Sequence, residues 1–266
     1  LIPAVAQMEL NGVLLDVEKW ESLAKKAEEK SKELAKEFTD MLFDRVDFTD
    51  YPNMYEAWKA SGITMPKTKK FEREMTAITD PSFYKDKLKE SFLISAPIQV
   101  KNMLRLAGIN VVSTEEDYLI EYGLDDPLIT KLIEFRGEFK KASTSGENFI
   151  KMIHPVTKRL HGQFNQMGTR SGRFSSKDPN MQNIMSEEEY RASFIAPQGK
   201  KFICADFSQE EYRLAGAISK EQAIIDAYKA GYDMHTKTAA IVNGIPIEQV
   251  TKKQRQEAKT INFSIL

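Results

Sequence analysis

A single cysteine, Cys204, stands among the 266 residues, so the chain cannot form a disulfide within itself. One free thiol fits a reducing compartment, because disulfide frameworks belong to oxidising ones. No apolar run approaches the roughly 20 residues of a membrane-spanning helix. The first residues also lack the basic start and long apolar stretch of a secretory signal. These absences exclude a disulfide-stapled scaffold, and we expect a protein that is neither secreted nor partnered with a membrane.

Net charge is nearly absent, at −1 for the whole chain. It is unevenly spread: residues 1–150 hold 21 Lys and Arg against 27 Asp and Glu, and residues 151–266 hold 17 against 12. The second part therefore carries a net charge of +5 and is compatible with phosphate binding. A mildly basic solvated surface explains the same charge equally well.

The first 150 residues have the pattern of long helices. Apolar residues recur at helical spacing over 16–42, behind a plausible N-cap at Asp16. Such a helix either packs inside a domain or forms a coiled-coil arm. A second long helix is predicted over 126–150. Between them we expect a loop-rich insertion with short helices over 44–92.

Two shorter helices are expected before the second long one. The first starts at Ser95-Ala96-Pro97, runs to about Leu106 and is closed by Gly108. The second would start at a capping box in which Glu116 follows Ser113 by three residues.

The pattern changes after Ile150. Strands are predicted over 159–166 and 200–206, with a loop rich in Ser, Gly, Asn and Arg between them. Helical spacing returns from Gln209 to the end. Helices followed by a strand-bearing module predict an α+β protein with a mostly helical first domain.

Asp206 ends the second predicted strand, just before a helix. A carboxylate at a strand end is rigidly placed and offers the oxygen ligands that Mg²⁺ prefers. Phosphoryl transfer uses such ions to stabilise charge on the attacking and leaving oxygens. An Asp in this place also serves commonly as a helix cap or turn residue.

Two further segments carry donors for phosphate. Residues 169–184 offer guanidinium, hydroxyl and amide groups with glycine flexibility, which suit phosphate oxygens and minor-groove acceptors. A plain polar loop has the same composition. In the last helix, Arg255, Lys259 and Phe263 are four residues apart and share one face, which could bind a triphosphate and stack on a base. An ordinary amphipathic helix with a basic rim has this spacing too.

These segments, in this order, resemble three motifs of the A-family DNA polymerases. Residues 171–184 resemble the stretch TGRLSSxxPNLQNIP, residues 206–213 resemble motif A (DYSQIELR), and residues 255–263 resemble the start of motif B (RxxxKxxNFGxxYG). Between the last two, residues 233–235 match the family's D-I-H. The resemblance is strong over 126–266 and thin over 44–92.

The resemblance implies the right-hand polymerase fold, with a helical thumb, a partial palm with an antiparallel sheet and partial helical fingers. On this basis residues 1–150 are thumb, with the insertion at 44–92, residues 151–219 are the first part of the palm with motif A, and residues 220–266 are the first part of the fingers, ending inside motif B. The implied activity is template-directed transfer of deoxynucleotides from dNTPs to a primer 3′-OH by two-metal phosphoryl transfer. The implied partners are primer–template DNA and dNTP, and the implied cofactor is Mg²⁺, as two ions.

Roles then follow position by position from the family. Asp206 and the Phe207 carbonyl would hold metal, and Lys259 would also donate a proton to pyrophosphate. Glu211 would crowd a 2′-hydroxyl, and Phe263 would stack on the nucleotide. Holding the triphosphate would fall to His235, Arg255 and Lys259. Contact with DNA would fall to Arg173, Asn180, Gln182, Asn183 and Arg213.

The chain departs from the family pattern at four positions and at its end. Phe207 stands for Tyr, Glu210 for Ile, Met185 for Pro and Ser264 for Gly. Motif C, with its second metal-binding aspartate, does not occur before Leu266. We therefore expect the second carboxylate ligand beyond Leu266, in the same chain or a second polypeptide, and expect this chain alone to be inactive.

Two other functions are weighed against the polymerase. The first is a non-catalytic module that binds primer–template DNA. DNA binding alone requires none of Asp206, Arg255 and Lys259, so the presence of all three argues against such a module. A single-subunit RNA polymerase is disfavoured by Glu211 and the motif A context. DNA synthesis predicts a location in the cytoplasm of a bacterial or phage-infected cell, or in an organelle.

Overall fold

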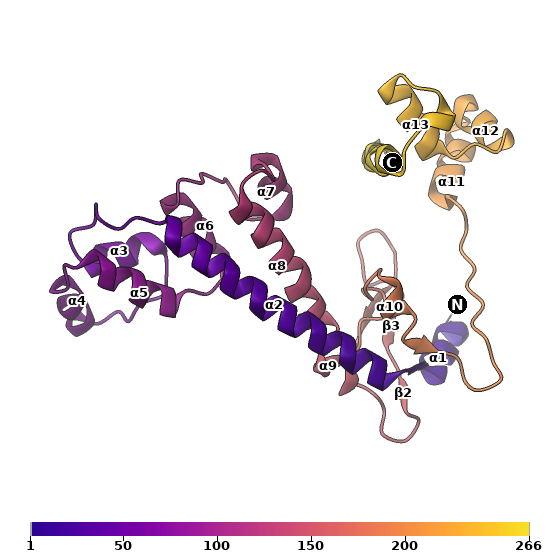
Figure 1. Cartoon of the computed structure of the whole chain (residues 1–266). Helices are drawn as coiled ribbons and strands as arrows, with labels where there is room; N and C mark the ends of the chain where they lie inside the picture. The colour runs from indigo at the N-terminus through magenta and orange to yellow at the C-terminus, as the bar shows by residue number, and fades with distance from the viewer. Residues whose placement is uncertain (1, 266) are drawn as a thin grey trace. The chain divides into compact units, whose positions relative to one another are not determined.

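The computed structural model describes residues 2–265. The chain divides into two compact units, Leu1–Lys201 (unit 1) and Phe202–Leu266 (unit 2). Each is described by itself. Among the described residues, no helix combines the length and the apolar character that crossing a membrane requires. Unit 1 is helical with two small antiparallel sheets, and unit 2 is helical (Figure 1).

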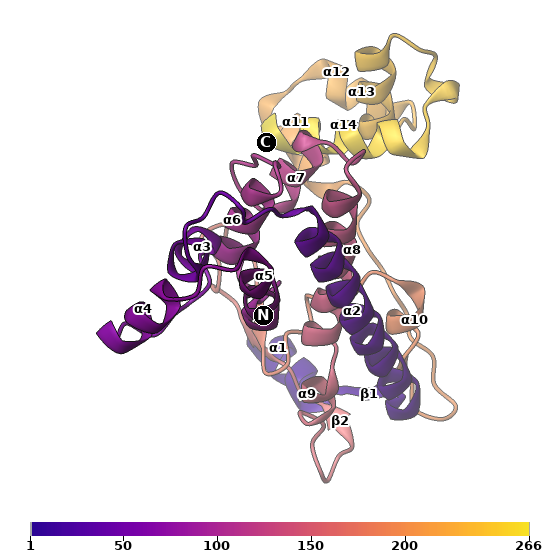
Figure 2. The same ribbon diagram turned by 60° about the vertical axis from the view of Figure 1, so that its left-hand side comes forward.

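A pair of long helices, α2 (Val17–Arg45) and α8 (Pro127–Thr144), runs side by side through unit 1 (Figures 1 and 2). The Asp16 side chain caps α2 by accepting from the Lys19 N–H at 3.1 Å, as the sequence predicts. The expected second long helix is wrong in its extent: α8 ends at Thr144, and α9 (Glu147–Ile150) is a separate turn. Gly146, the N-cap residue of α9, disfavours a continuous helix here because glycine loses more backbone entropy than other residues.

Residues 46–126 form a helical cap on the end of the pair that is far from the sheet (Figure 1). The predicted short helices of the 44–92 insertion are present as α3 (Met54–Ser61), α4 (Lys69–Thr76) and α5 (Pro81–Ser91). They are followed by α6 (Pro97–Leu106) and α7 (Glu116–Tyr122). The helix predicted to start at 95–97 and to end near Leu106 is confirmed as α6, with Ala96 as its N-cap and Gly108 at φ +82° behind it.

The predicted capping box at Ser113 is wrong. The Ser113 hydroxyl accepts from the N–H of Glu115, two residues on, and Glu115 rather than Ser113 precedes the first turn of α7. The short hydrogen-bonded turn therefore takes the place of the box.

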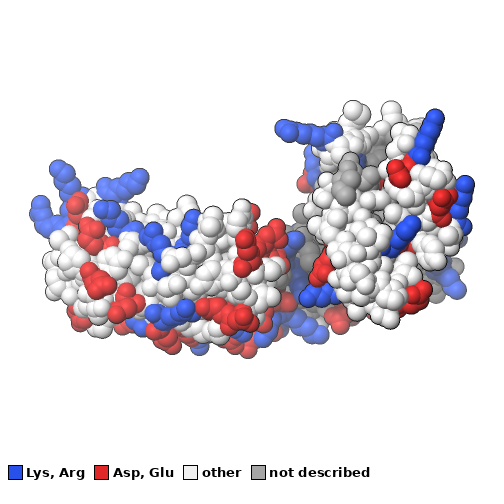
Figure 3. Space-filling view, turned by 90° about the horizontal axis from the view of Figure 1, so that it is seen from above, with Lys and Arg blue, Asp and Glu red and all other residues white. Residues whose placement is uncertain are grey.

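The cap and the helix pair share one apolar core. Its fully buried members include Phe38 and Leu42 of α2, Tyr84 of α5 and Leu132 of α8. The insertion is thus an integral part of unit 1. On the face seen in Figure 3, Lys and Arg side chains gather over the end that carries α3 to α5, but Asp and Glu lie among them.

The other end of the pair carries the sheets. β1 (Val13–Leu15) lies between β2 (Arg159–Leu160) and β5 (Phe194–Ile195), antiparallel to both. A second pair joins β3 (Gln163–Asn165) to β4 (Ser175–Lys177), also antiparallel. The remaining elements of unit 1 are α1 (Ile2–Asn11) and α10 (Glu188–Arg191). The strand expected over 159–166 is therefore two strands, broken at His161 and Gly162.

Trp20 centres a second, smaller core beside these sheets. Its ring is fully buried, stacks on Phe149 with centroids 4.6 Å apart, and meets Tyr190 and Phe194 edge-on. This cluster fastens the start of α2 to α9, α10 and β5. Segments more than a hundred residues apart in sequence meet here.

Unit 2 is built from α11 (Glu210–Ser219), α12 (Gln222–Lys229), α13 (Met234–Asn243), a short 3₁₀ turn at Ile247–Gln249 and α14 (Lys252–Ile265). The strand predicted over 200–206 is wrong, because residues 201–207 have no regular structure. The apolar residues of this segment are exposed to solvent, Ile203 to 94%. None of the strands in the described residues pairs with the segment. A strand without a hydrogen-bonded neighbour is not stable, whatever its side-chain pattern.

Candidate functional site

A pocket of about 380 Å³ in unit 2 is lined by seven of the candidate site residues that the sequence predicts. They are Asp206, Phe207, Glu211, His235, Arg255, Lys259 and Phe263, joined there by Gln209, Glu210 and Tyr212. The pocket is therefore formed by the segment before α11, the first turn of α11, the start of α13 and one face of α14. The spacing of four along α14 does place Arg255, Lys259 and Phe263 together.

One wall of the pocket is acidic and another is basic. Asp206, Glu210 and Glu211 supply three carboxylates, and all three residues are exposed. Arg255 and Lys259 supply two cations. The carboxylates that line the pocket outnumber the cations, and a divalent cation bound at the acidic wall would offset this excess of negative charge.

The donor atoms of the acidic wall are all oxygens, as hard cations require. The described residues contain no group of three or more His, Cys, Asp or Glu side chains arranged to hold a metal ion. Mg²⁺ commonly binds proteins through one or two carboxylates and completes its shell with water and substrate phosphates. The Asp206 wall fits that mode of binding.

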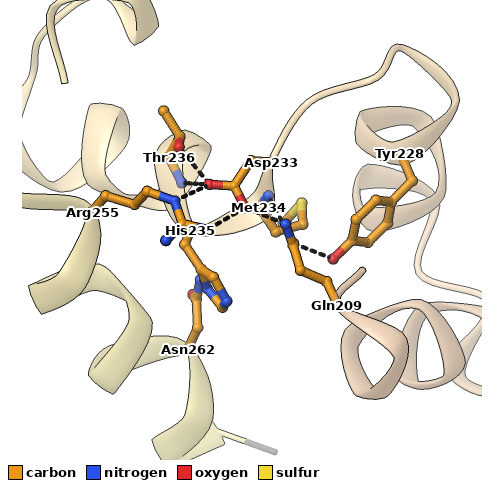
Figure 4. A network of polar contacts seen from close by, with 8 residues as sticks. All are labelled: Gln209, Tyr228, Asp233, Met234, His235, Thr236, Arg255 and Asn262. Carbon is orange, nitrogen blue, oxygen red and sulfur yellow. Dashed lines mark hydrogen bonds and ion pairs between the residues drawn. The ribbon is translucent and has the colours of Figure 1, made fainter. Parts of the chain in front are cut away.

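Arg255 is held by a two-pronged ion pair with Asp233. Its Nε and Nη2 donate to the two carboxylate oxygens at 2.7 and 3.1 Å (Figure 4). Asp233 also caps α13 by accepting from the Thr236 N–H at 2.9 Å. Burial raises the pKa of Asp233, but hydrogen bonds from Arg255 and Thr236 outweigh it and lower that pKa to about 2.

His235 is buried between two rings, those of Tyr212 and Phe263, with centroids 6.0 and 5.6 Å away. Its Nδ1 faces the Asn262 amide nitrogen at 2.9 Å, and the Asn262 oxygen accepts from Thr238. Because an amide nitrogen only donates, Nδ1 accepts, and the imidazole proton is left on Nε2. Burial lowers the pKa of His235 and so favours the neutral ring, which has a single donor.

Lys259 and Phe263 form the end of the basic wall. The Lys259 Nζ lies 5.9 Å from the centre of the Phe263 ring, which is 43% exposed. An exposed ring beside a cation can stack on a flat heterocycle while the cation meets its phosphates.

The predicted DNA-contacting residues lie outside this pocket. Arg213 stacks on the Tyr228 ring at 4.2 Å, and its Nε donates to the Ser208 carbonyl at 2.8 Å. The others belong to unit 1, around the β3–β4 pair, and are exposed: Arg173, Asn180, Gln182 and Asn183. Ser176 braces the turn that follows β4, since its hydroxyl accepts from the Met181 N–H and donates to the Pro179 carbonyl.

Sequence reasoning assigned no role to Asp233, Gln209 or Asn262, which hold the pocket together. The position of Asp233 just before a helix is a capping signal that could have identified it. The bond that matters most, to Arg255 22 residues away, leaves no local signal. The same holds for Asn262, whose partners His235 and Thr238 lie on another helix.

Comparison with known proteins relates the chain to one family and one fold. Residues 64–266 match the family model described as DNA polymerase family A. DNA polymerase I of Pseudomonas aeruginosa is 38% identical over 159 residues, which is 58% of this chain and 17% of the relative. The thermostable DNA polymerase I of Thermus aquaticus is 40% identical over 144 residues, or 53% of this chain and 17% of the relative. The chain thus spans about a sixth of the curated relatives that it matches.

A solved structure shares the fold. It is described as the POL domain of Pol1 from M. smegmatis in complex with DNA primer–template and dNTP. The match has a TM-score of 0.67 at 20% identity and covers 98% of this chain and 40% of that chain.

Proposed function

Since the chain belongs to DNA polymerase family A, we propose that it acts in template-directed DNA synthesis, with the pocket of unit 2 as the site for the incoming dNTP. The observation that carries the proposal is the meeting of an acidic wall, a basic wall and an exposed ring in one pocket. A deoxynucleoside triphosphate has a matching order of parts, with metal-binding phosphates and a flat base.

The basic wall would bind the triphosphate. Arg255 and Lys259 would donate to phosphate oxygens, and the Nε2–H of His235 would add a neutral donor. Lys259 would also donate a proton to the pyrophosphate as it leaves. Phe263 would stack on the nucleotide, and Glu211 would exclude a 2′-hydroxyl.

The acidic wall would hold Mg²⁺ through Asp206 and the Phe207 carbonyl. When bound, the metal supplies charge stabilisation on the attacking and leaving oxygens of the transfer. The three carboxylates otherwise repel a triphosphate, so cation binding at this wall is also needed for charge balance.

Primer–template DNA is the proposed partner of the exposed residues Arg173, Asn180, Gln182 and Asn183, with Arg213 supporting the primer terminus. The first four surround one β-hairpin, so a single duplex backbone could meet all of them. In this proposal the three-part division of thumb, palm and fingers, with its boundaries near 150 and 219, applies to the chain. Its place of action is where DNA and dNTPs occur, in the cytoplasm of a bacterial or phage-infected cell or in an organelle.

Primer extension tests the proposal, using the full-length gene product that carries this sequence. With Mg²⁺ and dNTPs, we expect the wild type to extend a primer and Asp206→Ala to lose several orders of magnitude in rate. Asp226→Ala is the matched control, because Asp226 is an exposed carboxylate on α12 outside the pocket, and should extend at the wild-type rate.

Two results would overturn the proposal in different ways. Normal DNA binding without extension by the wild type would identify a non-catalytic primer–template-binding module. Equal extension by Asp206→Ala and the wild type would show that the reaction takes place elsewhere.

A further inference from the structure

Asp233 engages the same side chain that the proposed function assigns to the triphosphate. Both of its carboxylate oxygens accept from the Arg255 guanidinium, at 2.7 and 3.1 Å. The pair joins the start of α13 to the first turns of α14 (Figure 4). Asp233 thus occupies two of the five N–H donors of Arg255 with an anion that belongs to the protein.

This pairing changes the charge that the pocket offers. Arg255 and Lys259 are the cations that line it, and the charge of Arg255 is already balanced by Asp233. Of the two described cations that line the pocket, Lys259 is therefore the one that Asp233 leaves available to a triphosphate. The remaining attraction from Arg255 depends on how far its guanidinium turns from Asp233 toward phosphate.

Asp233 keeps other donors if Arg255 turns away. The N–H and hydroxyl of Thr236 both donate to its Oδ2, and the Gln209 amide donates to its Oδ1. A partly buried carboxylate without partners would be costly, so these three bonds are what make release of Arg255 feasible.

Gln209 links this exchange to the segment that carries Asp206. It lies three residues after Asp206, in the left-handed region at φ +53°, where a residue other than glycine is strained. Its side-chain oxygen accepts from the Tyr228 hydroxyl at 2.7 Å and from the Met234 N–H at 3.3 Å. The amide nitrogen is thereby aimed at Asp233, and the start of α11 is tied to the start of α13.

We propose that Asp233 is a competing counter-ion for Arg255, one that a nucleotide triphosphate must displace and that therefore sets the affinity of the pocket. Asp233 touches no substrate in this proposal and acts through Arg255, with Gln209 and Thr236 holding it in place. The proposal rests on the proposed function, namely that the pocket receives the triphosphate.

Direct binding tests the proposal, with dATP and inorganic tripolyphosphate as probes in the presence of Mg²⁺. Isothermal titration calorimetry on the 266-residue chain compares the wild type with Asp233→Asn. Asparagine keeps the capping oxygen for Thr236 but removes the charge. Both probes should bind Asp233→Asn roughly two- to fivefold more tightly, as expected when a partly exposed ion pair no longer competes.

Three further variants make the result specific. Asp233→Glu restores the charge and should return affinity toward the wild type. Asp233→Ser is a second uncharged cap, which repeats the test should Asp233→Asn fold poorly. In an Arg255→Gln background, Asp233→Asn should change affinity by less than about twofold, because the guanidinium for which Asp233 and phosphate compete is no longer present.

Each remaining outcome has one meaning. Weaker or unchanged binding by both Asp233→Asn and Asp233→Ser would overturn the proposal, since a carboxylate that only positions Arg255 helps binding. A tightening that persists in the Arg255→Gln background would also overturn it, as a general charge effect. If Arg255→Gln alone leaves the affinity of the wild type unchanged, the pocket is not the triphosphate site, and it is the proposed function that fails.

Discussion

The interiors of unit 1 and unit 2 are stabilised by different kinds of contact. Unit 1 buries large side chains, among them Trp20, Phe38, Phe43 and Tyr84, at or near zero exposure. In the part of unit 2 that the structure describes, the buried hydrophobic residues are Tyr212, Ala227, Ala239 and Ala258. Its interior also holds two polar residues, His235 and Asn262. We infer that unit 2 is stabilised mainly by close helix contacts and hydrogen bonds, whereas unit 1 is stabilised mainly by the burial of large apolar side chains.

This difference has a functional side. The large side chains that fill the core of unit 1 lie outside the pocket of unit 2. In unit 2, the groups that bind one helix to the next are those beside the pocket, such as Asp233 with Arg255 and Asn262 with His235. In the proposed function, the same side chains would therefore contribute both to the stability of unit 2 and to the affinity of its pocket for the triphosphate.

The largest expected effect is on the core of unit 1. Phe38→Ala removes a fully buried ring and should lower the free energy of unfolding of unit 1 by about 3–5 kcal/mol. Both tryptophans, Trp20 and Trp58, lie in unit 1, so their fluorescence during urea unfolding reports on it alone. Lys36→Ala, on the exposed side of the same helix, is the control and should change little.

The same variant, Phe38→Ala, tests by hydrogen exchange whether the two units unfold independently. Hydrogen exchange of α13 and α14 should keep wild-type protection in Phe38→Ala. Equal loss of protection in both units would show that they unfold together and would break the comparison.

The second largest effect is expected where a small residue, Ala258, lies at a helix contact of unit 2. Ala258 of α14 is 2% exposed, and α14 packs against α13. Ala258→Leu should destabilise unit 2 by about 1–3 kcal/mol, because the added atoms have no space. The measurement is the exchange protection of α13 and α14, with the exposed Gln256→Leu as control. Unchanged protection in Ala258→Leu would mean that the contact is loose.

The parts of the fold that were predictable are those with local causes. The long helix predicted over 16–42 follows from its apolar spacing and from Asp16, although it continues to Arg45. The helix that ends at Leu106 follows from Pro97 and Gly108. The sheet was not predictable in this way, because β1 pairs with strands about 145 and 180 residues away. Gly12 is one trace of that pairing: at φ +54°, a side-chain Cβ there would lie 2.6 Å from the Leu160 carbonyl oxygen.

The candidate site shows the same division. The spacing of Arg255, Lys259 and Phe263 predicts their common face, and resemblance to family motifs supplied Asp206, Glu211 and His235. What joins these groups is tertiary and was missed. The prediction of a strand that ends at Asp206 is wrong, because a side-chain pattern carries no information about whether a partner strand is present.

The ion pair of unit 2 predicts a pH dependence. The pKa of Asp233 is lowered in the folded state to about 2 from 3.8, so its contribution to stability is present above pH 4 and is lost as the pH falls toward 2. Because both partners are partly exposed, we expect about 1 kcal/mol for unit 2. Protection factors of α13 and α14, compared at pH 5 and pH 2.5, should fall in the wild type and fall less in Asp233→Asn. A parallel decline in both proteins would assign the loss to other carboxylates.

The smallest expected effect is that of a similar ion pair placed in unit 1. Lys141 bridges Glu138 at 2.9 Å and Glu187 at 3.0 Å, and so links α8 to the turn before α10. Lys141→Gln removes both contacts, yet it should lower the stability of unit 1 by no more than about 0.5 kcal/mol, because the apolar core around Trp20 already holds these segments together. Urea unfolding followed by tryptophan fluorescence measures the change. A loss in Lys141→Gln of about 1 kcal/mol, the value expected for the Asp233–Arg255 pair of unit 2, would mean that polar contacts carry equal weight in both units.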